Sequence, residues 1–512
     1  MTLSNNEYDF AWKPTNPNRW ERNIDEVEQF YTSLAKAHEG TSRTFFAMTG
    51  FISFSLPIEK DVTRQITEER MREALQKAWI RLRYEHPTIG SRVEYNQEDQ
   101  KCKKVYETFS ETFPQTNWLD TTFRVISNGM SGRDWCNSDP PVPALPTIFL
   151  IMSPSGIDRV SADLVLRAHH DVIDGIGTLT LFNNLFSHAA QAYEQQSSYA
   201  LPKFGDEWVR LSPPLRVAAS IPPKLEEKQA ERMRDILAFN VALKENVEVA
   251  SIPFRKDQVG PGKHQRVEKT LSKDVTTRLL DACRRAGLSV THAYHTATAL
   301  SVRDAQEQGQ SERKVRYINY SLINERPHCE DPYGTPAHPA SVYHSVSGRC
   351  LFVDLTVPAL SSTKDMISGD ETARVEFMEA SRVIRDYYMN IRDDPEHIKF
   401  VPSYWAMSTL PYPSDGKTPT IPARNETPSV SISSMGVIDR IIRQSHGKFD
   451  LEEPWVTGEE LGTGLGLFLG TWKGRLTLSA AYNDAWHDKG DVLEFLDRCN
   501  QKTLQALDIG SS

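Results

Sequence analysis

The 512-residue sequence lacks any long apolar segment. A helix that crosses a bilayer needs about eighteen consecutive apolar residues, and no such run occurs. The N-terminal segment has neither the basic start nor the apolar stretch of a secretory signal. The six cysteines are scattered without a CxxC pair, so they predict no disulfide framework. We therefore expect a cytoplasmic protein that does not enter a membrane.

An excess of basic charge is also missing. The chain has 59 Lys and Arg residues against 68 Asp and Glu residues, which gives a formal net charge of −9. Nucleic-acid-binding domains generally carry a basic patch that neutralises phosphates. A polybasic membrane-binding surface needs clustered positive charge in the same way. The charge balance argues against both kinds of partner.

Signatures of several common enzyme classes are absent. The chain has no Walker A, GxSxG or HExxH sequence, which argues against an NTPase, an α/β-hydrolase and a zinc protease. His292 and His295 lie three residues apart on a predicted helix, but no third ligand accompanies them at a known spacing. We interpret both as structural and expect no metal. The same holds for a loop whose gaps fit no zinc pattern, with His328, Cys329, His338 and His344.

What the sequence does contain is an alternation of helix and strand patterns. Thr67 is expected to cap a helix that ends before Pro87, and Ser272 to cap another that Gly287 ends. The alternation predicts an α/β or α+β protein with two lobes. Further helices are predicted from Thr291 and over 492–507, and strands over 44–56, 147–152, 163–168, 315–323, 429–438, 465–470 and 475–482.

Two polar, proline-bearing stretches predict how the chain is divided. Residues 1–22 are expected to form an arm on the surface. Residues 203–265 hold several prolines and a charged run over 224–235, which predicts a connecting segment with one solvated helix. We expect an N-terminal lobe, a linker and a C-terminal lobe, at residues 1–205, 206–265 and 266–512.

One stretch places chemically useful side chains at a junction between elements. Residues 162–168 alternate like a strand, and Asp174-Gly175 is a helix-start signal. An apolar helical face follows, from Ile176 to Tyr193. His169, His170 and Asp174 therefore lie where a buried strand passes into a helix, a position that holds side chains rigidly beside a cleft.

The string His169-His170-x-x-x-Asp174-Gly175 resembles the HHxxxDG signature of the CoA-dependent acyltransferase superfamily. This superfamily includes chloramphenicol acetyltransferase, the plant BAHD acyltransferases, the condensation domains of peptide synthetases and fungal O-acetyltransferases. Weaker matches follow in the family's order, so that the resemblance spans about residues 20–507. They are Arg81–Pro87, Gly287–Ala293, Tyr317–Arg326 and Ser433-Ser434-Met435-Gly436.

The resemblance implies a fold and a reaction. The fold would be α/β, with two chloramphenicol-acetyltransferase-like lobes, each a mixed β-sheet packed with helices, and an active-site tunnel between them. A monomer would transfer acetyl from acetyl-CoA to a hydroxyl of a small molecule. The HHDVIDG variant and Asn324-Glu325-Arg326 resemble in particular the fungal trichothecene 15-O-acetyltransferases, which implies the C-15 hydroxyl of a trichothecene as acceptor.

The resemblance also implies roles for single residues. His170 would be the general base, because a neutral imidazole can take the proton of an attacking hydroxyl. Asp174 would pair with Arg326 and hold the loop. Gly175 would allow a tight turn. Ser434 would donate a hydrogen bond to the oxyanion of the tetrahedral intermediate.

Plainer interpretations stay open for several of these residues. His169 is assigned a supporting role, because its neighbour on a strand faces the other way. Asp174 would serve equally well as a helix N-cap. Arg326 would also be explained as a surface charge, and Ser434 as an ordinary strand serine.

Two alternatives also remain for the function. One is a condensation-like enzyme that takes its acyl group from a carrier protein. The other is a catalytically silent member of the fold that acts as a binding module. The BAHD sequence DFGWG and an evident carrier-protein docking phrase are both absent, and the second absence favours free acetyl-CoA as donor.

Overall fold

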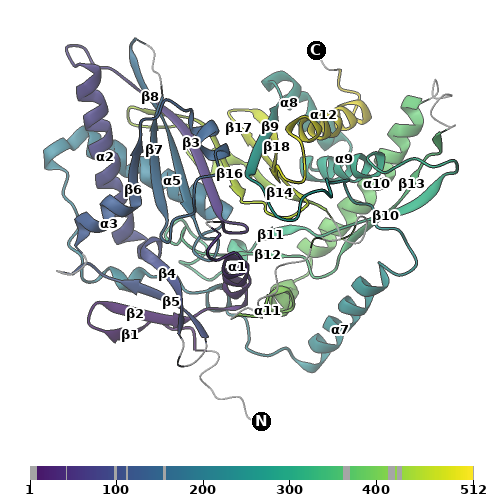
Figure 1. Ribbon diagram of the computed structural model, residues 1–512, viewed down its shortest axis with the longest axis horizontal. Coiled ribbons are helices and arrows are strands. Elements are labelled where there is room, and N and C mark those ends of the chain that lie inside the picture. The colour runs from purple at the N-terminus through teal and green to yellow at the C-terminus, as the bar shows by residue number, and fades with distance from the viewer. Residues whose placement is uncertain are drawn as a thin grey trace.

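The chain folds into two lobes that lie side by side, with the N-terminal lobe on the left of Figure 1. Each lobe has a β-sheet packed with helices, which confirms the predicted fold class. In the described part of the chain, no helix is both long and apolar enough to span a bilayer. The computed structural model describes residues 9–41, 43–96, 98, 101–110, 114–153, 157–360, 369–412, 421, 423 and 429–510.

The N-terminal lobe is built on a six-stranded sheet of order β15-β16-β3-β8-β7-β6. All neighbours are antiparallel except the parallel pair β6 and β7. Helices α2 (Arg64–Glu85) and α5 (Gly175–Gln195) pack on it and bury Leu75, Trp79 and Phe182 completely. The strands are β3 (Met48–Pro57), β6 (Phe123–Ile126), β7 (Thr147–Met152), β8 (Arg159–Ala168), β15 (Ser445–His446) and β16 (Phe449–Gly458).

The C-terminal lobe is built on a four-stranded sheet of order β14-β17-β18-β9. Leu279, Leu467 and Leu496 are fully buried in its core, which therefore joins sheet and helices into one cluster. Its strands are β9 (His264–Thr270), β14 (Val430–Val437), β17 (Leu465–Trp472) and β18 (Arg475–Asn483). Its helices are α8 (Lys273–Arg285), α9 (Val290–Asp304), α10 (Gly369–Arg392) and α12 (Lys489–Ala506).

Strands β15 and β16 cross from the C-terminal half into the N-terminal lobe. β16 pairs with β3 from Gly458↔Met48 to Asp450↔Ser55. The chain then returns to its own lobe as β17. The division at residue 266 does not include this exchange, because a strand pattern does not reveal which sheet completes it.

The first residues form part of a sheet rather than a surface arm. β1 (Lys13–Asn16) and β2 (Arg19–Asn23) join β5 (Lys101–Glu107) and β4 (Ser91–Asn96) in the order β1-β2-β5-β4. Pairing of β2 with β5 buries the side chain of Arg22. The prediction of an arm was wrong for this segment, and residues 1–8 lie outside the described part of the chain.

The segment predicted as a linker contains the expected helix. α7 (Glu227–Ala242) covers most of the charged run, and half of its residues are exposed. It is also anchored, because Met233 packs with Phe400 and Tyr404 of α11 (His397–Ser408). The segment therefore lies against the C-terminal lobe.

The predicted helix ends are correct in one case and shifted in another. Ser272 caps α8, and Gly287 follows its end with a φ of 67°. For α2 the N-cap is Thr63 rather than Thr67. Thr67 lies one turn inside the helix, where its hydroxyl donates to the carbonyl of Thr63.

The remaining short elements are α1 (Glu26–Ala37), α3 (Gln115–Thr122), α4 (Gly132–Asn137), α6 (Leu215–Ala218), β10 (Arg313–Asn319), β11 (Leu322–Asn324), β12 (His344–Val346) and β13 (Leu351–Val357).

Candidate active site

A cavity of about 450 Å³ lies between the two lobes. The N-terminal lobe contributes α1, β3 and the start of α5, and the C-terminal half contributes β11, β12, β14 and α11. The segment predicted as a linker adds Leu237 and Asn240. Much of the wall is apolar and aromatic, which suits a small ligand with a large hydrocarbon surface. These wall residues include Phe30, Phe46, Met48, Ile176, Tyr404 and Trp405.

His170 faces this cavity from the loop between β8 and α5, residues 169–174. β8 ends at Ala168 and α5 begins at Gly175. His170 is half-buried and belongs to the cavity wall. His169 is also half-buried, but it is not among the described residues that line the cavity. Of the two neighbouring histidines, the structure therefore assigns only His170 to the cavity wall.

The His170 ring lies against an aromatic partner. The Tyr31 ring stacks on it with 3.8 Å between centroids and 12° between planes. His344 is 5.3 Å away, centroid to centroid, and its Nε2 is 2.9 Å from the Tyr31 hydroxyl. Burial, with a smaller contribution from His344, lowers the pKa of His170 to about 3. The imidazole is therefore neutral near pH 7, as a proton acceptor must be.

Asp174 both caps α5 and forms an ion pair. Its Oδ1 accepts from the Gly177 backbone N–H at 2.7 Å. Its Oδ2 accepts from Arg326 Nη1 and from the Tyr343 backbone N–H, each at 2.9 Å. Asp174 is thus both the N-cap of α5 and the partner of Arg326. Burial acts to raise the pKa of Asp174, but the charge and hydrogen bond of Arg326 outweigh it and lower the pKa below its usual value.

Gly175 occupies a crowded position rather than a strained turn. It is the first residue of α5, and its φ is not in the left-handed region. A Cβ there would lie 3.2 Å from Cγ2 of Val456 and 3.4 Å from Sδ of Met435. The expected tight turn is therefore wrong as the reason for glycine. Close approach of β16 and β14 to the helix start explains it instead.

Ser434 reaches the cavity from the other lobe. It is exposed on β14 and lines the cavity with Ser431, Ser433 and Met435. Its Oγ accepts a hydrogen bond from Thr291 Oγ1 at 3.0 Å. The structure thus brings His170 and Ser434 to one cavity from different lobes.

Three wall residues were not singled out as site residues from the sequence. Tyr31 is an ordinary apolar position in the pattern of α1, and His344 was noted only within a loop without a zinc pattern. Glu460 is buried at the wall, and its Oε1 accepts from the Gly462 backbone N–H at 2.8 Å. Burial raises the pKa of Glu460 to about 7. No local sequence signal distinguishes these residues, because distant segments bring them together.

The paired histidines of α9 take part in the hydrogen bonds of the core. His292 Nδ1 accepts from the Ser289 backbone N–H at 3.2 Å and completes the capping box of the helix. His295 lies 3.0 Å from the Tyr388 hydroxyl and 3.1 Å from the Tyr317 hydroxyl. These contacts confirm the structural interpretation of both residues.

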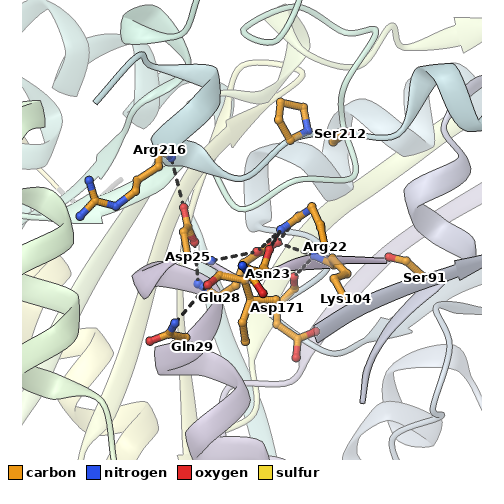
Figure 2. Close-up of polar contacts among 12 residues, drawn as sticks. Arg22, Asn23, Asp25, Glu28, Gln29, Ser91, Lys104, Asp171, Ser212 and Arg216 are labelled. Atoms are coloured by element: carbon orange, nitrogen blue, oxygen red, sulfur yellow. Dashed lines mark hydrogen bonds and ion pairs between the residues drawn. The ribbon is translucent and has the colours of Figure 1, made fainter. Parts of the chain in front are cut away.

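A buried ionic cluster contacts the 169–174 loop through Asp171 (Figure 2). Arg22 donates to both carboxylate oxygens of Glu28, at 2.6 and 2.7 Å. Lys104 donates to Glu28 Oε1 at 2.6 Å and to the carbonyl of Asp171, the residue after His170. The side chain of Lys104 is only 1% exposed. Since an unpaired buried charge is costly, arrangements that keep Lys104 paired with Glu28 are favoured.

The chain is similar to named fungal acetyltransferases. It is 24% identical over 515 residues to acetyltransferase pigO of Monascus ruber, covering 97% of this chain and 98% of the relative. It is 24% identical to O-acetyltransferase pigM of the same organism, covering 94% and 84%. An azaphilone biosynthesis cluster protein M of Aspergillus terreus is 25% identical over 70% of this chain and 81% of its own length. No protein-family model matches the chain.

Solved structures share the whole fold. The trichothecene 15-O-acetyltransferase TRI3 of Fusarium sporotrichioides superposes with a TM-score of 0.76 at 17% identity, covering 97% of this chain and 98% of that one. The first condensation domain of the calcium-dependent antibiotic synthetase gives 0.59 at 13% identity, covering 96% and 98%. The fold likeness and the named relatives confirm the predicted two-lobed architecture and the predicted enzyme class, an acyltransferase.

Proposed function

We propose that this acyltransferase moves the acetyl group of acetyl-CoA to a hydroxyl of an apolar secondary metabolite, with His170 as general base. The observation that carries the proposal is the place of His170. A neutral imidazole faces an inter-lobe cavity whose other wall carries hydroxyl groups. The named acetyltransferases among the relatives support the choice of acetyl-CoA as donor.

The proposed step is direct transfer without an acyl-enzyme. The acceptor O–H bond breaks as its proton moves to His170, and the oxygen forms a C–O bond to the thioester carbonyl. The Nδ1 atom of His170 is buried, so Nε2 is assigned as the acceptor of this proton. The tetrahedral intermediate then collapses, the C–S bond breaks, and the imidazolium returns the proton to the leaving thiolate. Atoms and charges balance, and no other reactant is needed.

Two supporting roles belong to the same proposal. Ser434 is assigned as a hydrogen-bond donor to the oxyanion, because it lines the same cavity as His170. Asp174 is assigned a structural role through Arg326 rather than a place in a triad. Its two carboxylate oxygens already accept hydrogen bonds from Gly177, Arg326 and Tyr343.

The acceptor class follows from the wall of the cavity. Its many aromatic and aliphatic side chains favour a compact hydrocarbon skeleton with few polar groups. We propose the C-15 hydroxyl of a trichothecene as the first acceptor, supported by the fold of TRI3. A hydroxylated azaphilone is the second, because one relative is named for azaphilone biosynthesis.

Release of free thiol from acetyl-CoA tests the function. Purified protein is assayed with 15-hydroxy trichothecenes and with hydroxylated azaphilones, and acetylated products are identified by mass spectrometry. We expect acceptor-dependent release that falls about 10²- to 10⁴-fold in His170→Ala. His169→Ala is the matched variant, and we expect it to lose less than about tenfold, since His169 is not on the described cavity wall. Near-normal turnover by His170→Ala would refute the general base.

A carrier-protein donor is the second candidate function. The likeness to a condensation domain over nearly the whole chain is the observation that favours it. Acetyl groups loaded on phosphopantetheinyl carrier protein are offered in place of acetyl-CoA, with the same acceptors. Turnover with the loaded carrier but not with acetyl-CoA would select this alternative. Absence of turnover with both donors would favour a silent binding protein.

A further inference from the structure

Helix α1 presents one face to the loop that carries His170. Glu28, Tyr31 and Thr32 have the spacing i, i+3 and i+4, so they lie on the same side of the helix. Glu28 holds Lys104, which donates to the Asp171 carbonyl. Thr32 Oγ1 donates to Asp171 Oδ2 at 2.9 Å. Tyr31, between them, stacks on His170 itself.

Tyr31 is also fixed from the other lobe. Its hydroxyl is 2.9 Å from Nε2 of His344, on β12. The backbone N–H of Tyr343, one residue earlier, donates to Asp174 Oδ2. Asp174 therefore reaches His170 indirectly, because it fixes the start of β12, and β12 carries the imidazole that holds Tyr31. This path explains how a carboxylate outside hydrogen-bond contact with the base contributes to the site.

The positive charge that forms on His170 during transfer has no carboxylate of the described chain in direct contact to stabilise it. In a catalytic triad, a carboxylate stabilises the imidazolium that forms when histidine takes a proton. No carboxylate among the described residues makes an ion pair with His170. The charge of Asp174 favours the imidazolium only without direct contact, and this carboxylate already pairs with Arg326. The group in face-to-face contact with the His170 ring is the Tyr31 ring, at 3.8 Å. The electron-rich face of an aromatic ring attracts a cation in this position.

We propose that Tyr31 is the positioning residue of His170, and that its ring stabilises the imidazolium formed during transfer, in place of a triad carboxylate. The proposal rests on the proposed function, in which His170 is the base. The position of the Tyr31 ring is fixed by His344. The position of the loop is fixed at Asp171, by Thr32 directly and by Glu28 through Lys104. Transfer of the proton creates the positive charge on His170, and return of the proton to the thiolate removes it.

A series of ring substitutions separates this electrostatic role from a merely structural one. Tyr31→Phe keeps the stacked ring and loses only the hydroxyl contact with His344. A second variant has 3,4,5-trifluorophenylalanine in place of Tyr31. Compared with Tyr31→Phe, it keeps the shape of the ring and withdraws electron density from the ring face. We expect kcat for thiol release to fall about tenfold between these two variants, with KM for acetyl-CoA changed less than twofold. Equal kcat values would overturn the stabilising role.

A measurement that needs no turnover tests the stacked contact on which the positioning role depends. In protein labelled at the histidine Cε1 carbon, the stacked Tyr31 ring shifts the His170 Cε1–H signal upfield, and His170→Ala identifies that signal. We expect the upfield shift in wild type, in Tyr31→Phe and in the surface control Gln29→Ala, and its loss in Tyr31→Leu. An unchanged signal in Tyr31→Leu would overturn the proposal. If wild type releases no thiol, the proposed function fails, and this measurement alone decides whether the Tyr31 ring stacks on His170.

Discussion

At the scale of single residues, the site depends on charges that are buried in pairs. The side chains of Asp174 and Arg326 are only 4% and 9% exposed. Removing one partner of such a pair leaves an uncompensated charge in a poorly solvated place. The pair therefore has a measurable effect on stability that is separate from any effect on turnover.

We expect Arg326→Ala to lower the free energy of unfolding by about 3 to 5 kcal/mol, because it leaves the Asp174 carboxylate without its counter-ion. Urea denaturation of the wild type and the variant measures this loss. The double variant Asp174→Asn, Arg326→Ala removes both charges and should be less destabilised than the sum of the single changes Asp174→Asn and Arg326→Ala. Additive effects, or a stable Arg326→Ala protein, would show that the two residues do not act as a pair.

The sequence identified this pair and the histidine, but it did not identify their surroundings. HHxxxDG is a local pattern, so His170 and Asp174 are recognised without knowing the fold. Tyr31 and His344 become neighbours of His170 only after three distant segments have folded together, since the Tyr31–His344 contact joins residues 313 positions apart. Gly175 was predicted for the wrong reason, because the crowding by Val456 is likewise a long-range contact.

At the scale of elements, local signals gave most helix and strand positions. Strand β7 coincides with its predicted range, and α8 begins after the predicted cap Ser272. Errors arose where two residues offered the same signal. Thr63 and Thr67 both precede the apolar stripe of α2, and propensity alone does not choose between them. The structure chooses Thr63, since its Oγ1 accepts from the Ile66 backbone N–H.

A pair of substitutions tests this assignment. Thr63 is exposed, so Thr63→Ala removes little besides the cap, and we expect it to cost about 1 kcal/mol of unfolding free energy. Thr67→Val keeps the shape of a buried side chain and loses a hydrogen bond within the helix, so we expect a smaller cost. Urea midpoints of the two variants give the comparison. A larger loss for Thr67→Val would restore the cap that the sequence predicted.

At the scale of the whole molecule, the strand that the lobes exchange forms part of the cavity wall. β16 leaves the C-terminal half and pairs with β3, and its Val456 and Gly458 then line the cavity together with His170. A strand pattern specifies the faces of a strand but not its partners. The sequence therefore predicted two lobes from its alternating pattern and a tunnel by resemblance, while the strand that joins the lobes was found only in the structure.

Titration of buried groups is a second property of the whole molecule, and two sets of groups oppose each other. Burial lowers the pKa of nine described histidines, so the unfolded chain binds protons first as the pH falls below about 6.5. These are His86, His170, His264, His292, His295, His338, His344, His446 and His487. Burial raises the pKa of three carboxyl groups to about 7, so in the same range the folded chain binds their protons first. These are Asp25, Glu459 and Glu460.

The nine histidines should have a larger effect on stability than the three carboxyl groups. We therefore expect the free energy of unfolding to fall as the pH falls below about 7. Proton uptake by the unfolded chain lowers stability as the pH falls, whereas the three carboxyl groups raise it over the same range. We expect the melting temperature to be about 5 °C lower at pH 5 than at pH 7. Differential scanning calorimetry at constant ionic strength measures it. Glu460→Gln removes one opposing group and should steepen the fall, because the folded protein then loses a site that binds a proton. A melting temperature that is constant or higher at pH 5 would show that the carboxyl groups outweigh the histidines.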